Sequence, residues 1–148
     1  MNTQNARPTV PSPFWWRWLI VATVFIIVTG LSMVIIPVPV SRMFGTILST
    51  PVETFGETAN AYLLLFQGVL GGTMAGWGMA FLLILIGSFR RGSKEGWTTI
   101  AVSLATWFVL DSFFSLWTGF WMNAVLNAVF LILFIIPLAA TYRTFFPK

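Results

Sequence analysis

Four long apolar runs dominate this chain and limit what it can fold into. They occupy about residues 15–36, 61–86, 97–116 and 120–140. A helix needs about 20 apolar residues to cross the roughly 30 Å hydrocarbon core of a bilayer, because each residue adds about 1.5 Å. The sequence therefore predicts an all-α membrane protein, a single domain in which four transmembrane helices form a bundle.

The scarcity of charge supports this fold class. Only 8% of the 148 residues are charged and 57% are hydrophobic, whereas soluble domains carry roughly 25% charged residues. So few charges cannot cover a globular surface, and most of the surface must therefore face lipid. The net charge of +4 does not predict nucleic-acid binding, because the basic residues are scattered at the ends of the apolar runs.

The residue types that are missing also exclude several kinds of chemistry. The chain has no cysteine and no histidine. These absences exclude a disulfide framework, a thiol redox centre, a zinc site of the usual type and histidine-ligated haem. We expect no cofactor and no metal.

The segments between the runs are predicted to form two loops on opposite sides of the membrane. Residues 37–60 form the predicted outer loop and residues 87–96 the predicted cytoplasmic loop. Pro37 and Pro39 end the first span, because proline has no backbone N–H to donate within a helix. Segment 41–49 is mildly amphipathic, and both a short interfacial helix and an irregular loop are compatible with it.

The distribution of basic residues predicts the orientation. The side shared by the termini and the 87–96 loop holds seven: Arg7, Arg17, Arg90, Arg91, Lys94, Arg143 and Lys148. The opposite side holds Arg42 alone. Cytoplasmic loops carry an excess of Lys and Arg, so both termini are predicted to be cytoplasmic.

The first run is longer than the apolar core of a cleaved signal peptide, which predicts a retained anchor. The compact, cysteine-free chain suits a bacterial cytoplasmic (inner) membrane.

The second run carries a repeat of small residues. Gly68, Gly72, Gly76 and Ala80 recur every four residues, which places them near one another on the helix surface. In lipid, small residues let two helix backbones approach closely, and this contributes much of the packing. We expect this face to pack inside the bundle; the alternatives are a homo-oligomer seam and a seam with a partner subunit.

One acidic residue lies within a predicted span. Asp111 is the only charged residue between Glu95 and Arg143. Asp costs roughly 2.5–3.5 kcal/mol at the centre of a transmembrane helix, so Asp111 requires a partner. Asp111 precedes Gly119 by eight residues and Asn127 follows it by eight. If Gly119 is the turn of an antiparallel hairpin, both lie at about the same depth, roughly 12 Å from the turn.

Other polar residues gather around this depth. Asn123 is one helical turn from Asn127, and Trp107 and Ser115 lie one turn on either side of Asp111. We expect Asp111 to face the two asparagines across the hairpin. The predicted polar cluster comprises Asp111, Asn123, Asn127, Gln67, Arg42 and Glu57. We favour hydrogen bonding that holds the helices together. The alternatives are a pocket for a small molecule, lipid headgroup, quinone or ion, and a role in proton translocation.

The sequence contains no motif for a phosphate-binding loop, a serine hydrolase elbow or a zinc protease. We therefore expect no catalytic residues and no enzymatic activity. The favoured interpretation is an accessory or structural subunit that packs against partner membrane helices. The alternatives are a small-ligand or lipid-binding membrane protein that uses the pocket around Asp111, and an oligomeric transporter or channel. The expected partners are the lipid bilayer and either further copies of the chain or a larger membrane complex.

Overall fold

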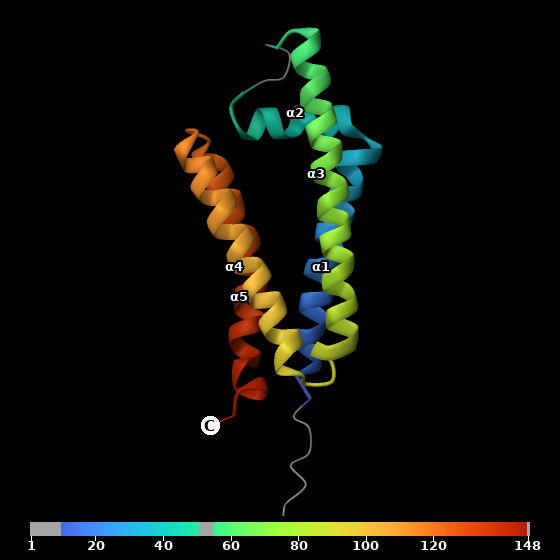
Figure 1. The fold of residues 1–148 in the computed structure, drawn as a ribbon, viewed down its shortest axis with the longest axis vertical. Coiled ribbons are helices and arrows are strands. Elements are labelled where there is room, and N and C mark those ends of the chain that lie inside the picture. Colours follow the sequence, from blue (N-terminus) through green and yellow to red (C-terminus); the bar gives the residue numbers. More distant parts are fainter. Residues whose placement is uncertain (1–9, 51–54, 148) are drawn as a thin grey trace, which may run out of the picture.

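A computed structural model describes residues 10–50 and 55–147 of the chain. Arg7 and Lys148, two of the residues that predict the orientation, lie outside these ranges. The described residues form helices and no strand: α1 (Pro13–Ile35), α2 (Pro37–Ile47), α3 (Glu57–Ile84), a π-helical continuation η2 (Leu85–Phe89), α4 (Lys94–Trp117) and α5 (Trp121–Phe145) (Figure 1).

Four of these helices are long and apolar enough to cross a membrane: α1, α3 with η2, α4 and α5. This confirms the predicted all-helical architecture and indicates a small multi-pass membrane protein. The helices extend a few residues beyond the predicted runs, because hydropathy detects the apolar part of a helix and not its polar ends. Thus α3 begins at Glu57, α4 at Lys94, and α5 continues past Pro137 to Phe145.

Helix α2 decides between the two interpretations of segment 41–49. The segment is largely helical, and its helix begins earlier than the amphipathic pattern, at Pro37. Proline is favourable at the first position of a helix, where its missing N–H would have no partner. Figure 1 shows α2 lying crosswise to the long helices at one end of the bundle.

The long helices form two pairs that join at one end of the molecule. Helix α1 packs mainly on α3, helix α4 packs on α5, and α1 also contacts α5. The pairs diverge toward the end where α2 lies (Figure 1). The buried apolar core comprises Leu19, Ala22, Ile26, Phe81, Leu85, Phe89, Ile100, Leu104, Phe134, Leu138 and Phe145. We call the half that contains this core the closed half, and the half beneath α2 the open half.

Close approach of two backbones fixes the α1–α3 pair. A Cβ atom added to Gly71 would lie 2.5 Å from the carbonyl oxygen of Gly30. A Cβ atom added to Gly78 would lie 2.6 Å from the side chain of Ile27. Both distances are too short for a real Cβ, so a larger residue at either position would push the helices apart.

The predicted small-residue face does not take part in this packing. A Cβ atom added to Gly68, Gly72 or Gly76 would meet nothing within 4 Å, and Ala80 is exposed. The expectation that this face packs inside the bundle is therefore wrong. Helix α3 meets α1 with a different face, the one that carries Gly71 and Gly78. These two glycines are seven residues apart and therefore only about 20° from each other around the helix.

Indole N–H groups hold the closed half together. Trp18 Nε1 donates a hydrogen bond of 2.8 Å to the backbone oxygen of Leu133. In an uninterrupted helix that oxygen would accept from residue 137, but Pro137 has no N–H. The indole of α1 therefore supplies the donor that α5 lacks. Trp16 and Trp97 also donate to backbone oxygens of neighbouring helices, at 2.9 and 3.0 Å.

Candidate functional site

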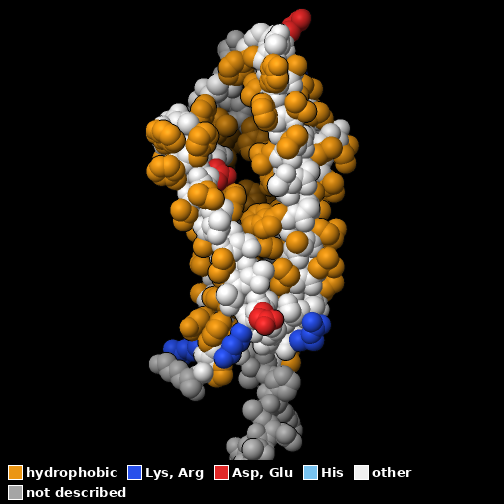
Figure 2. Space-filling view, in the orientation of Figure 1, with side chains coloured by type: hydrophobic (Ala, Val, Ile, Leu, Met, Phe, Trp, Pro, Cys, Tyr) orange, Lys and Arg blue, Asp and Glu red, His pale blue; other side chains and the backbone are white. Residues whose placement is uncertain are grey.

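A hollow separates the two helix pairs in the open half. Two cavities of about 260 and 520 Å³ adjoin there and share Asp111, Asn123 and three apolar residues in their walls. We call the smaller one, which reaches the core, the deep cavity, and the larger one the α2 cavity. Figure 2 shows this hollow as an opening between the two arms of the molecule.

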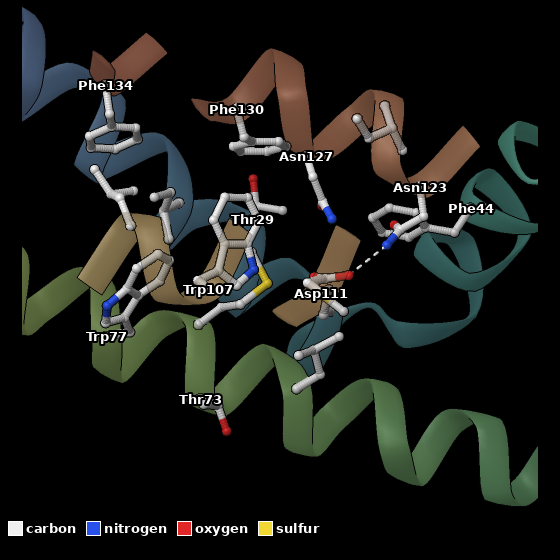
Figure 3. Close-up of a pocket in the computed structure, with 16 residues that line it drawn as sticks. Thr29, Phe44, Thr73, Trp77, Trp107, Asp111, Asn123, Asn127, Phe130 and Phe134 are labelled. Atoms are coloured by element: carbon white, nitrogen blue, oxygen red, sulfur yellow. Dashed lines mark hydrogen bonds between the residues drawn. The ribbon is translucent and has the colours of Figure 1, made fainter. Parts of the chain in front are cut away.

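Aromatic rings form the end of the deep cavity nearest the core. Trp77 of α3 and Trp107 of α4 bring their ring centroids to 5.9 Å, and Phe130 and Phe134 of α5 line the opposite wall. Figure 3 shows Trp107 and Asp111 projecting from α4 into the same space. The deep cavity therefore has an aromatic end and a polar end one helical turn apart.

Hydrogen bonds fix the carboxylate of Asp111 at the polar end. Asn123 Nδ2 donates to Asp111 Oδ1 at 2.9 Å (Figure 3) and to Ser115 Oγ at 2.8 Å. The Ser115 hydroxyl lies 2.7 Å from the backbone oxygen of Asp111 and 3.1 Å from its Oδ1. A hydroxyl has one hydrogen, so it donates to one of these oxygens at a time. Within the described residues Oδ2 accepts no hydrogen bond, and Asp111 lines both cavities.

The second asparagine has a different partner from the one predicted. Asn127 is 5% exposed, and its Nδ2 donates to Ser112 Oγ at 3.3 Å. Counting from the turn gives its depth correctly, because Asp111 and Ser112 are neighbours. Counting does not give the angle around the helix, and Ser112 is the one that faces α5. Asp111 lies at the edge of the hairpin interface, turned toward the cavities.

The structure separates the other three predicted cluster residues from the carboxylate. Gln67 Nε2 donates to the backbone oxygens of Pro37 and Met33, at 2.8 and 3.4 Å. The Met33 oxygen is the one left without its helical donor by Pro37, so Gln67 stabilises the α1–α2 junction, and it also lines the α2 cavity. Arg42 and Glu57 are exposed and are not among the described residues that line either cavity.

Several wall residues were not predicted from the sequence. Phe44 reaches both cavities from α2, and Thr29 reaches the deep cavity from α1. No local pattern marks these residues, because their role depends on where α1 and α2 lie relative to the hairpin. The i, i+4 spacing of Trp107, Asp111 and Ser115 is the one local signal that joins the aromatic and polar ends of the site.

Comparison with known proteins gives no match: no family model, no curated protein and no solved structure is similar to the chain at a significant level. The fold and the site therefore define its class. It is a small multi-pass helical protein with a cleft between its helix pairs. The chemistry of that cleft carries the functional argument.

Proposed function

We propose that the protein binds a small amphiphilic molecule, such as a lipid or a lipid-like compound, in the cleft between its helix pairs. One observation carries this proposal. Cavities of about 260 and 520 Å³ with mostly apolar walls meet at a half-buried carboxylate whose Oδ2 has no partner among the described residues. Ligand sites of roughly 300–1,000 Å³ typically combine apolar walls with a few placed polar groups.

The alternative role for Asp111, hydrogen bonding that holds the helices together, fits a neighbouring pair better. Ser112 and Asn127 are both buried in the α4–α5 interface and bond to each other. Asp111 instead lies where the two helix pairs separate, and the described residues donate to only one of its carboxylate oxygens. A carboxylate that served only to hold the helices together would be expected to have both oxygens hydrogen-bonded, because a polar atom without a partner is costly in an apolar environment.

The proposed orientation places the cleft in the outer half of a bacterial cytoplasmic membrane. The described basic residues of the closed end are Arg17, Arg90, Arg91, Lys94 and Arg143. Figure 2 shows basic side chains gathered at the end opposite the hollow. An excess of Lys and Arg favours the cytoplasmic side. With that end in the cytoplasm, α2 lies at the outer interface and a ligand enters from the outer leaflet.

A matched pair of substitutions tests ligand binding. Leu70 and Leu65 both belong to α3 and are 53% and 59% exposed, but only Leu70 lines the cavities. We expect native mass spectrometry of the protein in mild detergent to detect a bound small molecule in the wild type and in Leu65→Trp. We expect Leu70→Trp, which fills the cleft, to lose it. Equal binding by the two variants, or no bound species in the wild type after incubation with total membrane lipid, would refute the proposal.

A second candidate function is that of a subunit that packs against another membrane helix. The observation that favours it is the face of Gly68, Gly72 and Gly76, against which no described residue packs. Native gels should then show a complex larger than one chain, and Gly72→Leu should dissociate it. A monomer in both cases would exclude this role. A transport path through one copy has less support, because buried apolar side chains fill the closed half.

A further inference from the structure

We infer that the ligand of the cleft is a cationic amphiphile, with an N–H-bearing ammonium group that binds Asp111 and an apolar body that lies between the helix pairs. This inference rests on the proposed binding function and names its ligand class. It follows from three properties of the site: the hydrogen-bonding character of its remaining polar atoms, its charge and its aromatic wall.

The polar atoms around Asp111 that the described residues leave unused include several acceptors, while the indole N–H groups of Trp77 and Trp107 are donors that line the same cavity. Asp111 offers Oδ2, because the part of the chain that the structure describes donates only to its Oδ1. Asn123 donates both amide hydrogens and Asn127 donates one within the hairpin, and neither amide oxygen accepts a hydrogen bond from a described residue. A carboxylate oxygen and an amide oxygen accept hydrogen bonds. A ligand head that donates hydrogen bonds therefore complements the acceptors around Asp111.

The charge of the site selects a cation among such donors. Asp111 is the one charged residue among the described residues that line the two cavities. A carboxylate in a low-dielectric environment is unfavourable without an opposite charge. No Lys or Arg is among the described wall residues, so a ligand ammonium would complete the pair. An anionic head would add repulsion at the same position.

The aromatic wall fits both ends of such a molecule. Trp107 lies one turn from Asp111 on α4, and the two side chains enter the same space (Figure 3). The face of an indole attracts a cation, most strongly where water is excluded. Beyond it, Trp77, Phe130 and Phe134 offer apolar surface for a hydrocarbon or ring system. The ammonium head of an amphiphilic amine would therefore meet the carboxylate, the adjoining carbons would meet the indole of Trp107, and the apolar body would meet the apolar wall.

Photolabelling of the full chain in lipid nanodiscs tests this inference. The probes are a primary alkylammonium and the matching alkyl alcohol, with the same diazirine in the same chain, and labelled residues are located by mass spectrometry. We expect the ammonium probe to label cavity residues at least about tenfold more than the alcohol, a ratio that corresponds to about 1.4 kcal/mol. Asp111→Asn, which keeps the shape, should remove this preference. Glu57→Gln, an exposed acid outside the cavities, should retain it.

The outcomes separate the two levels of the proposal. Equal cavity labelling by the ammonium and the alcohol probes in the wild type would overturn the cation assignment while leaving amphiphile binding intact, and this comparison does not depend on a variant that folds. Labelling confined to lipid-facing residues with both probes would overturn the binding function itself. Given selective labelling, competition by phosphatidylethanolamine but not phosphatidylcholine in the nanodisc would assign the ammonium to a lipid headgroup. Labelling unaffected by either lipid would assign it to a free amine.

Discussion

The indole of Trp18 is expected to stabilise the closed half by replacing the N–H group that Pro137 lacks. Its Nε1 donates to the Leu133 oxygen at 2.8 Å, the oxygen that residue 137 would bind in a regular helix. Trp18→Phe removes the donor and keeps an aromatic ring. Pro137→Ala restores the backbone donor. Because both changes act on one carbonyl group, their effects on the free energy of unfolding should be coupled.

The expected magnitude follows from the state of the Leu133 carbonyl. In the wild-type background, Trp18→Phe leaves this oxygen without a donor. Interhelical hydrogen bonds in membrane proteins contribute about 0.6 kcal/mol on average and up to about 1.7, and a polar group left without a partner in an apolar environment costs about 1–3 kcal/mol. We therefore expect Trp18→Phe to lower the free energy of unfolding by about 1–2 kcal/mol. With Pro137→Ala present, the cost should fall below about 0.5 kcal/mol, because α5 then supplies its own donor.

Equilibrium unfolding in mixed detergent micelles measures this coupling. The chain has no cysteine, so dyes for energy transfer can be attached to single cysteines placed at the exposed positions Glu57 and Thr118, one on each helix pair. Trp15→Phe is the control, since the structure records no hydrogen bond from its indole to a described residue. A Trp18→Phe cost that is the same with and without Pro137→Ala would refute the reasoning.

Three further predictions concern the packing and the site. Gly71→Ala should lower the free energy of unfolding by about 1–3 kcal/mol because its Cβ would meet a backbone oxygen at 2.5 Å, whereas Gly72→Ala, with nothing within 4 Å, should change it by less than about 0.5 kcal/mol. Gln67→Leu should destabilise the protein by about 1 kcal/mol, as seen in detergent unfolding, yet leave the ammonium preference in photolabelling unchanged; the opposite pattern would make it a ligand-binding residue. Asn123→Ala should weaken that preference severalfold, because it frees the Asp111 carboxylate to rotate; an unchanged ratio would show that the hydrogen bond does not position the carboxylate.

The sequence predicts the helices well because the membrane imposes a length on them. Each span must satisfy its backbone hydrogen bonds internally and stay apolar for about 20 residues, and both requirements leave a trace in hydropathy. The face with which a helix packs against its neighbour is harder to predict from the sequence. Gly68, Gly72 and Gly76 form the more regular pattern, yet Gly71 and Gly78 make the contact. Which face meets a neighbour depends on the neighbour, and hydropathy is nearly uniform around a helix in lipid.

For the site as well, the sequence predicts how deep each hairpin residue lies but not the direction in which its side chain points around the helix. The turn at Gly119, where φ is +85°, sets the depth of every residue in the hairpin, and counting from it places Asn127 beside Asp111 and Ser112. Counting does not decide between these two, because adjacent residues point about 100° apart. The separation of the helix pairs and the crosswise position of α2 are tertiary features. These features form the cavities that Asp111 lines, with an Oδ2 that accepts no hydrogen bond from a described residue.

The two helix pairs and their junction explain why the cleft can persist in the folded protein. The α1–α3 pair is fixed by the Gly30–Gly71 contact, and the α4–α5 pair by the Asp111–Asn123 and Ser112–Asn127 hydrogen bonds, all of which lie in the open half. Each pair is therefore held together alongside the cleft, while the buried core joins the pairs in the closed half. Closing the cleft would require a change at that packed junction, because interiors at native density do not deform continuously. The packed junction in the closed half therefore sets the width of the site.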